Sequence, residues 1–312
     1  MKTAFVFPGQ GSQSVGMMKG YSDVPLIHET FSEAADILKQ DLWALVNQGP
    51  AEDLNLTVNT QPVMLTAGIA VYRAWENLGG KKPDYLAGHS LAEYTALVVS
   101  GALTFSDALK LVSYRAKTMQ ECVPEGMGGM AAIVGLDDDE VRAVCAEIIS
   151  SCDGMSLEPA NFNSPGQVVI AGHKNAVQHA MALSKAKGAK LAILLPMSIP
   201  SHCSLMRPAA EKMHQLLEKI SFERPTIPIL HNVDVQQHHD AMSIREILAK
   251  QLYSPVRWTE TIRAFASAGV DHVVECGPGK VLTGLTKRID AKLKNLSLTD
   301  SNALRQAIDI LK

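Results

Sequence analysis

The chain has 312 residues, of which 46% are hydrophobic and 20% charged, so it can bury one large core or two of moderate size. Its 29 basic and 32 acidic residues give a net charge of -3, which argues against a general nucleic-acid binder. The five cysteines form no C-x-x-C pair, no apolar run reaches membrane-spanning length, and the N-terminal stretch is too short for a signal peptide. We therefore expect a cytoplasmic enzyme or binding protein.

The chain opens with an apolar strand candidate at residues 2–7, followed by the loop PGQGSQSVG. This loop is similar to a dinucleotide-binding fingerprint, but Ser14 stands where the third glycine is needed. The alternative is a main-chain turn that delivers an N–H group into an active site. Helical patterns continue from there to residue 80.

The next predicted strand, DYLAGHS, ends in Gly88-His89-Ser90, and a helix sequence follows at once. A sharp turn from strand to helix exposes the residue at the turn and points free helical N–H groups toward it. Ser90 is therefore a candidate nucleophile, and a serine that only caps the helix is the alternative. The stretch departs from the G-x-S-x-G pattern because Ala92 occupies the fifth position.

A second helix is predicted over residues 104–123, with Thr104 as its N-cap. Arg115 lies in this helix beside an apolar stripe. Pattern alone favours an arginine that extends from the helix edge to solvent. If its head reaches a pocket instead, it becomes a bidentate binder of a carboxylate.

Residues 126–197 show the order β-α-β-β-α-β, which is typical of a ferredoxin-like split fold. Strands are predicted at 129–135, 155–163, 167–172 and 189–196, and helices at 137–150 and 174–188. This order predicts a small domain inserted into a discontinuous large domain made of residues 1–125 and 198–312.

After the insert, the α/β alternation returns. Strands are predicted at 227–233 and 272–277, and helices at 243–252, 259–269, 280–289 and 302–311. Alternation of this kind predicts a mostly parallel sheet covered by helices. Ligands bind beyond the carboxyl ends of such strands, which is where Ser90 would lie.

A serine nucleophile needs a base, and His202 in PMSIPSHCSLMRP is the strongest candidate among ten histidines. Prolines bracket the irregular segment around it, just after a strand and before a helix. The alternative is a histidine at a helix start. Cys203 is expected to be a small packed residue, because neighbouring side chains diverge, and His238 and His239 are expected to be exposed.

These stretches together resemble the malonyl-CoA:acyl-carrier-protein transacylases of fatty acid synthesis, whose relatives include acyltransferase modules of polyketide synthases. The resemblance covers essentially the whole chain. The matching blocks, in the family's order, are FVFPGQGSQSVGM, NTQPVML, GHSLAEYTALV, YRAKTMQ, ANFNSPGQVVIAG, PSHCSLM and QLYSPVRW. Where the family usually has glycine this chain has Ala92, for which we expect a small local adjustment.

The resemblance implies a fold, a reaction and partners. The fold is an α/β-hydrolase-like large domain with a ferredoxin-like insert. The reaction is ping-pong transfer of malonyl from malonyl-CoA to the phosphopantetheine thiol of acyl carrier protein, without cofactor or metal and without nucleic-acid or membrane partners. The site residues it implies are Ser90 as nucleophile, His202 as general base, Arg115 as carboxylate binder, Gln10 and Leu91 as oxyanion N–H donors, and Gln251 orienting His202 through a carbonyl.

Because carrier proteins are commonly acidic, a basic surface is expected near the C-terminus. The candidates are Lys280, Lys287, Arg288, Lys292 and Lys294, and a solvated helix face is the alternative. Other functions stay open at this point. They are a serine esterase or thioesterase, the acyltransferase of a malonate decarboxylase or polyketide system, and a catalytically silent carrier-binding module.

Overall fold

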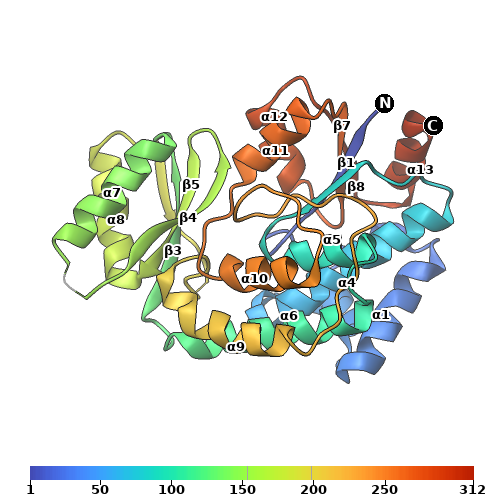
Figure 1. The fold of residues 1–312 in the computed structure, drawn as a ribbon, viewed down its shortest axis with the longest axis horizontal. Coiled ribbons are helices and arrows are strands. Elements are labelled where there is room, and N and C mark those ends of the chain that lie inside the picture. Colours follow the sequence, from blue (N-terminus) through green and yellow to red (C-terminus); the bar gives the residue numbers. More distant parts are fainter. Residues whose placement is uncertain (153, 198) are drawn as a thin grey trace.

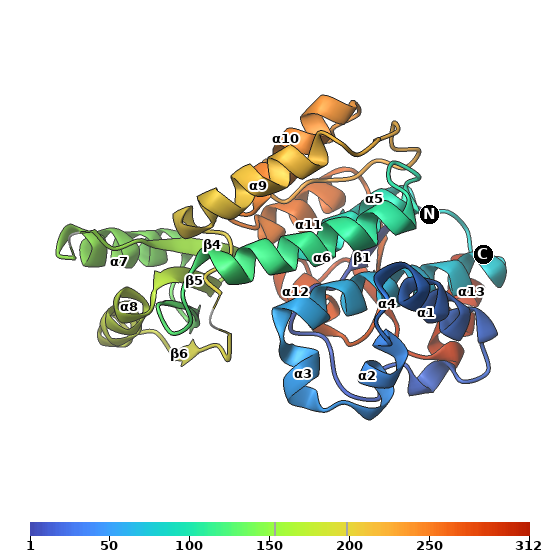
Figure 2. The same cartoon turned by 90° about the horizontal axis from the view of Figure 1, so that it is seen from below.

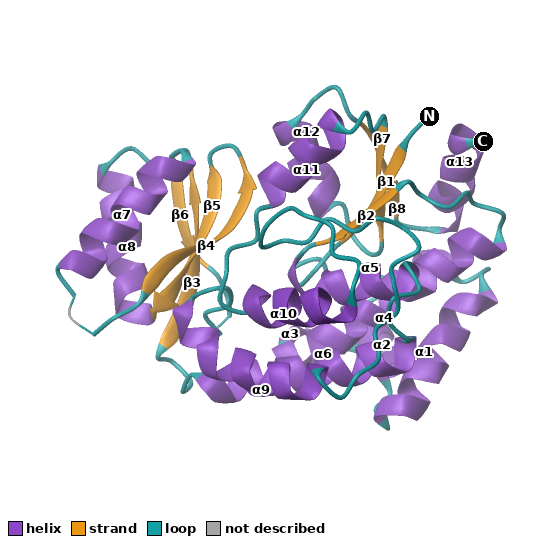
Figure 3. Cartoon of the chain, in the orientation of Figure 1, coloured by secondary structure: helices purple, strands orange, loops and turns teal. Residues whose placement is uncertain are grey.

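The computed structural model describes residues 1–152, 154–197 and 199–312, and its strands form two separate sheets (Figures 1 and 3). The larger sheet has the order β2-β1-β7-β8, and each neighbouring pair is parallel. Its strands are β1 (Thr3–Phe7), β2 (Tyr85–Gly88), β7 (His272–Cys276) and β8 (Lys294–Leu298). This confirms the predicted parallel α/β sheet.

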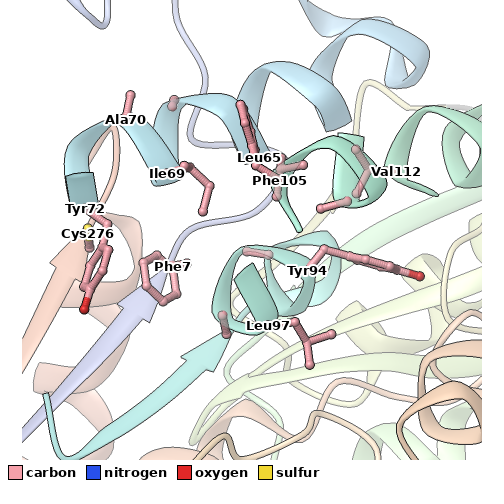
Figure 4. Packing of buried hydrophobic residues seen from close by; sticks show 14 of the residues in the cluster. Phe7, Leu65, Ile69, Ala70, Tyr72, Tyr94, Leu97, Phe105, Val112 and Cys276 are labelled. Atoms are coloured by element: carbon pink, nitrogen blue, oxygen red, sulfur yellow. The ribbon is translucent and has the colours of Figure 1, made fainter. Parts of the chain in front are cut away.

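After Thr3, strand β1 is apolar and buried on both faces, because helices cover both faces of the sheet. Phe5 and Phe7 belong to one apolar cluster, and Ala4 and Val6 to another on the opposite face. Figure 4 shows Phe7 beside side chains of helix α4 (Thr57–Asn77), among them Ile69. The sheet is thus a rigid base for the loops that follow its strands.

The cluster containing Phe5 and Phe7 is built from most of the helices. They are α1 (Pro25–Leu38), α2 (Leu42–Gln48), α3 (Ala51–Asn55), α4 (Thr57–Asn77), α5 (Glu93–Val99), α6 (Phe105–Cys122), α9 (Arg207–Leu217), α10 (Ala241–Gln251) and α13 (Ser301–Leu311). The opposite face is covered by α11 (Trp258–Ser267) and α12 (Val281–Ile289). Within the described residues, no helix combines the length and apolar character needed to cross a membrane.

The smaller sheet has the order β4-β5-β3-β6 with antiparallel neighbours, and it lies to one side of the large sheet (Figures 1 and 2). Its elements are β3 (Gly128–Val134), α7 (Asp138–Ser150), β4 (Leu157–Ser164), β5 (Gln167–His173), α8 (Lys174–Ala186) and β6 (Leu191–Leu194). This is the predicted ferredoxin-like arrangement. The domain boundaries at 126 and 197 stay a prediction.

At the large sheet, one predicted strand does not form and one observed strand was not predicted. Residues 227–233 make only an isolated bridge, between Ile229 and Leu86, because Pro228 lacks a donor and the chain turns away at Asn232 to bond elsewhere. Strand β8 was not predicted, because KNLSL is a short and mostly part-exposed strand with a weak apolar signal.

Candidate active site

Ser90 lies at the turn from β2 into α5, where its φ is 55°. A side chain on Gly88 would place its Cβ 1.9 Å from the carbonyl carbon of Ala92, so this position needs glycine. Ala92 itself has an ordinary helical φ of -74° and is buried. In this turn, the backbone of Ala92 therefore lies against Gly88, and Gly88 is the residue that cannot carry a side chain. Ala92 has a backbone conformation that any residue can adopt, which explains why alanine fits at the fifth position.

The side chains of Ser90 and His202 contact each other, although 112 residues separate them in the chain. Ser90 Oγ lies 2.7 Å from His202 Nε2, and His202 Nδ1 lies 2.9 Å from the main-chain oxygen of Gln251. A carbonyl oxygen can only accept a hydrogen bond, so Nδ1 carries the ring proton and donates it to this contact, and Nε2 is left as the acceptor for the serine hydroxyl. The family resemblance implied this contact between His202 and the main-chain carbonyl of Gln251.

His202 is held in an unusual conformation and a dry environment. Its φ is 64°, its N–H donates to the main-chain oxygen of Leu252 at 2.9 Å, and its side chain is buried. Burial, followed by the nearby charge of Arg115, lowers the pKa of His202 to about 3. The imidazole is therefore neutral at ordinary pH and able to accept a proton.

Arg115 is 1% exposed, so it does not extend to solvent as the pattern alone favoured. Its Nη1 donates to Gln61 Oε1 at 2.8 Å, and its Nη2 donates to Gln251 Oε1 at 2.9 Å and to Ser90 Oγ at 3.4 Å. These three acceptors carry no formal charge, whereas the guanidinium is a buried cation. The arrangement favours an anionic ligand next to Ser90.

A pocket of about 440 Å³ lies over Ser90, between the two sheets. Side chains of both domains line it, including Ser90, His202 and Arg115, with Gln10 and Leu91 beside them. Its size suits a small-molecule ligand. All six residues implied by the resemblance, Gln251 included, are therefore brought to one place by the fold.

Several polar residues of the site were not predicted from sequence. Asn232 Oδ1 accepts the N–H of Ser90 at 2.7 Å, and its Nδ2 donates to the carbonyl of Gly88 at 2.7 Å. Glu93 in turn accepts the N–H of Asn232 at 3.0 Å and contacts His231. The sequence offered one signal for these residues: Asn232 in ILHN and Glu93 in SLAEY are polar residues next to apolar ones, which indicates a buried polar group.

The remaining candidates behave as packed or paired residues. The pKa of Cys203 is raised to about 12 by burial, which fits the predicted small packed residue and not a thiol nucleophile. His238 is not exposed as expected but half-buried and paired with Asp234, whereas His239 is exposed. Across the described residues, no group of three or more His, Cys, Asp or Glu side chains is placed to hold a metal ion.

The fold and the site together define a class of α/β proteins in which a serine–histidine pair and a buried arginine share one pocket, an arrangement typical of acyl-transferring and acyl-cleaving enzymes. The sequence model of the acyl transferase domain matches residues 4–296. A curated relative from Salmonella typhimurium, named malonyl CoA-acyl carrier protein transacylase, is 55% identical over 98% of each chain. The chain belongs to the family of malonyl CoA-acyl carrier protein transacylases, within the acyl transferase domains, which confirms the resemblance.

Solved structures agree with this assignment. An acyl-carrier-protein S-malonyltransferase from Burkholderia pseudomallei is 53% identical, with a TM-score of 0.96 over 99% of this chain and 100% of that one. A malonyl-transacylase solved in complex with a type II polyketide synthase acyl-carrier protein is 50% identical, with a TM-score of 0.97 over 99% and 100% of the two chains.

Proposed function

We propose that this chain transfers the malonyl group from malonyl-CoA to the phosphopantetheine thiol of an acyl carrier protein, for fatty acid synthesis. The observation that carries the proposal is the buried cation of Arg115, 3.4 Å from Ser90 Oγ and held by uncharged partners. A malonyl group on that oxygen carries a free carboxylate that can pair with the guanidinium. The names of the relatives support the same substrate and acceptor.

The first half-reaction acylates the serine. His202 Nε2 accepts the proton of Ser90 Oγ as the oxygen attacks the thioester carbonyl carbon. The main-chain N–H groups of Leu91 and Gln10 stabilise the resulting oxyanion, and losing one such donor costs about 3 kcal/mol of barrier. The C–S bond then breaks, and His202 returns its proton to the coenzyme A thiolate.

The second half-reaction repeats these steps with the carrier thiol as nucleophile, which regenerates free Ser90. The main-chain oxygen of Gln251 stabilises the transient imidazolium less than a carboxylate would, and a reactive thioester tolerates this. Every group in this scheme belongs to the chain or to its substrates, so we propose that the reaction needs no cofactor or metal.

Intact mass measurement after brief mixing with malonyl-CoA tests the function. We expect a malonyl increment on the protein that disappears when a carrier thiol is added. Rapid release of free malonate without an acceptor would indicate a thioesterase. The absence of any increment, together with no acylation of the carrier, would indicate a silent carrier-binding module.

The acylation rate is expected to be flat over an unusually wide pH range. The lowered pKa of His202, about 3 against an ordinary 6.5, keeps the imidazole neutral from about pH 5 upward. Single-turnover acylation by malonyl-CoA is therefore expected to change little between about pH 5 and pH 8. A decline on acidification with a midpoint near 6.5 would contradict this protonation state.

Among the basic residues proposed for the carrier surface, Arg288 near the end of α12 has a contact that links it to the pocket. Arg288 is exposed and donates to Gln167, which lines the pocket. Lys294 instead pairs in register with His272 at the start of β7, whereas Ser90 follows the carboxyl end of β2. Lys292 and Lys294 thus lie toward the opposite end of the sheet and are poor candidates for docking.

Arg288→Glu is expected to raise the KM for an acidic carrier about tenfold at low salt, with less effect at high salt. Acylation by malonyl-CoA alone is expected to stay unchanged. Lys292→Glu makes the same change in charge just before the start of β8, without a contact to a residue that lines the pocket among those described, and serves as the control. Equal effects of the two variants, or a KM for the carrier that ignores salt, would contradict this docking surface.

The pathway and the cellular location are further parts of the proposal. Carriers of fatty acid and of type II polyketide synthesis can be compared directly as acceptors, since one related structure contains the latter. We also propose a cytoplasmic location. The five cysteines are all free thiols, which suits a reducing compartment.

A further inference from the structure

A buried carboxylate lies behind the site, and it is not among the described residues that line the pocket. Glu93, the first residue of α5, is 1% exposed. The groups that face it can all donate: the side-chain amide nitrogen of Gln251, the main-chain N–H of Asn232 at 3.0 Å, and Nδ1 of His231 at 2.9 Å. An ionised carboxylate only accepts, so it satisfies all of them at once.

The side-chain amide of Gln251 lies between Glu93 and Arg115 and contacts both. Gln251 Nε2 donates to Glu93 and to the main-chain oxygen of Ser90, the latter at 2.9 Å. Its Oε1 is then turned toward Arg115 and accepts from Nη2 at 2.9 Å. An amide has one donor end and one acceptor end, so the two acceptors Glu93 and the oxygen of Ser90 together determine which end faces the guanidinium.

We propose that Glu93 is a positioning residue for Arg115, acting through the side-chain amide of Gln251. The inference rests on the proposed function, in which Arg115 binds the malonyl carboxylate. The guanidinium needs a fixed acceptor on Nη2 to keep its planar fork directed at the acyl group. Glu93 also places a negative charge behind the amide, opposite in sign to the buried cation, without occupying the place of the substrate carboxylate.

Glu93→Gln isolates this effect because it keeps the size of the side chain. The new carbonyl oxygen can still accept from Asn232 and His231, at the place of Oε1. The new NH₂ group then faces Gln251 Nε2, donor against donor. If the amide of Gln251 turns over to relieve this, it presents a donor to Arg115 and withdraws one from the oxygen of Ser90.

The test is a double-mutant cycle with Arg115→Ala, measured as acylation by malonyl-CoA at low substrate concentration. A misplacement of about 1 Å at a positioning group can cost about 100-fold in rate, which is the loss expected for Glu93→Gln in the wild-type background. In the Arg115→Ala background, the same substitution is expected to cost less than about threefold, because its target is already gone.

Gln251→Met is the second variant of the cycle. If Glu93→Gln does not fold, this variant tests whether the amide of Gln251 positions Arg115. It removes the amide but leaves the main-chain oxygen that contacts His202. The same pattern is expected, with a loss of about 100-fold when Arg115 is present and less than about threefold when it is absent.

Glu275→Gln is the matched control, since Glu275 is also fully buried and accepts main-chain N–H groups of Leu282 and Thr283 away from the pocket. Its acylation rate is expected to stay within about twofold of wild type. Equal losses from Glu93→Gln with and without Arg115, or no loss in the wild-type background, would overturn the inference. Failure of the wild-type chain to accept malonyl would instead overturn the proposed function.

Discussion

Ser90→Ala is expected to abolish the malonyl-enzyme and to lower turnover by about 10⁶-fold, as loss of a serine nucleophile does in a hydrolase that works through the same pair. The reason is geometric. Ser90 Oγ is the oxygen that contacts His202 Nε2, at 2.7 Å, and it lies at the base of the pocket. Intact mass after mixing with malonyl-CoA, together with the rate of carrier malonylation, measures both effects.

Ser100→Ala is the matched control for that experiment. Ser100 is also buried, but its hydroxyl donates to the carbonyl of Leu97 at the end of α5, outside the pocket. Its acyl-enzyme is expected to form normally. A malonyl increment that survives in folded Ser90→Ala protein would move the nucleophile to another residue, which peptide mapping would locate.

Arg115→Ala is expected to lower malonyl transfer by about 1,000-fold, because it removes charge-assisted hydrogen bonds of about 1.5–3 kcal/mol each from the acyl carboxylate. Acetyl transfer is expected to fall far less, since an acetyl group leaves the cation without a partner in the wild-type chain as well. The gap between the two substrates should therefore narrow. Acylation rates with malonyl-CoA and acetyl-CoA give the ratio directly.

Two further variants make the Arg115 result specific. Arg115→Lys keeps the charge but not the planar fork, so it should recover only part of the malonyl preference. Arg73→Ala removes an arginine that pairs with Glu33 outside the pocket, and the substrate ratio is expected to stay as in the wild type. An equal loss of malonyl and acetyl transfer in Arg115→Ala would contradict the carboxylate-binding role.

Local sequence patterns were enough to predict much of the fold. The turn at Ser90, the N-cap at Thr104 and the split β-α-β-β-α-β order of the small domain all appear in the structure. Each depends on residues within a few positions of one another, such as the apolar run of β1 that both faces of the sheet bury. The short strand β8 was missed because its pairing with β7 supplies what its own pattern lacks.

The resemblance to a known family, and not the local pattern, named in advance the six residues that the fold brings together. Pattern alone allowed Ser90 to be a cap, His202 a helix start and Arg115 a solvent-directed side chain. The buried partners Gln61, Glu93 and Asn232 were not singled out, because a polar residue in an apolar context shows that it needs a partner but not which one.

Neighbours in the chain therefore determine most of the strands, helices and sharp turns, and the exceptions are β8 and residues 227–233, where pairing with distant segments decides. The chemistry of the site depends on contacts between distant segments. Ser90 meets His202 across 112 residues, and Arg115 meets Gln61 and Gln251 across 54 and 136. Folding buries these groups together. Burial lowers the pKa of His202, so that its imidazole is neutral, and it places the cation of Arg115 among uncharged partners, where an anionic ligand is favoured.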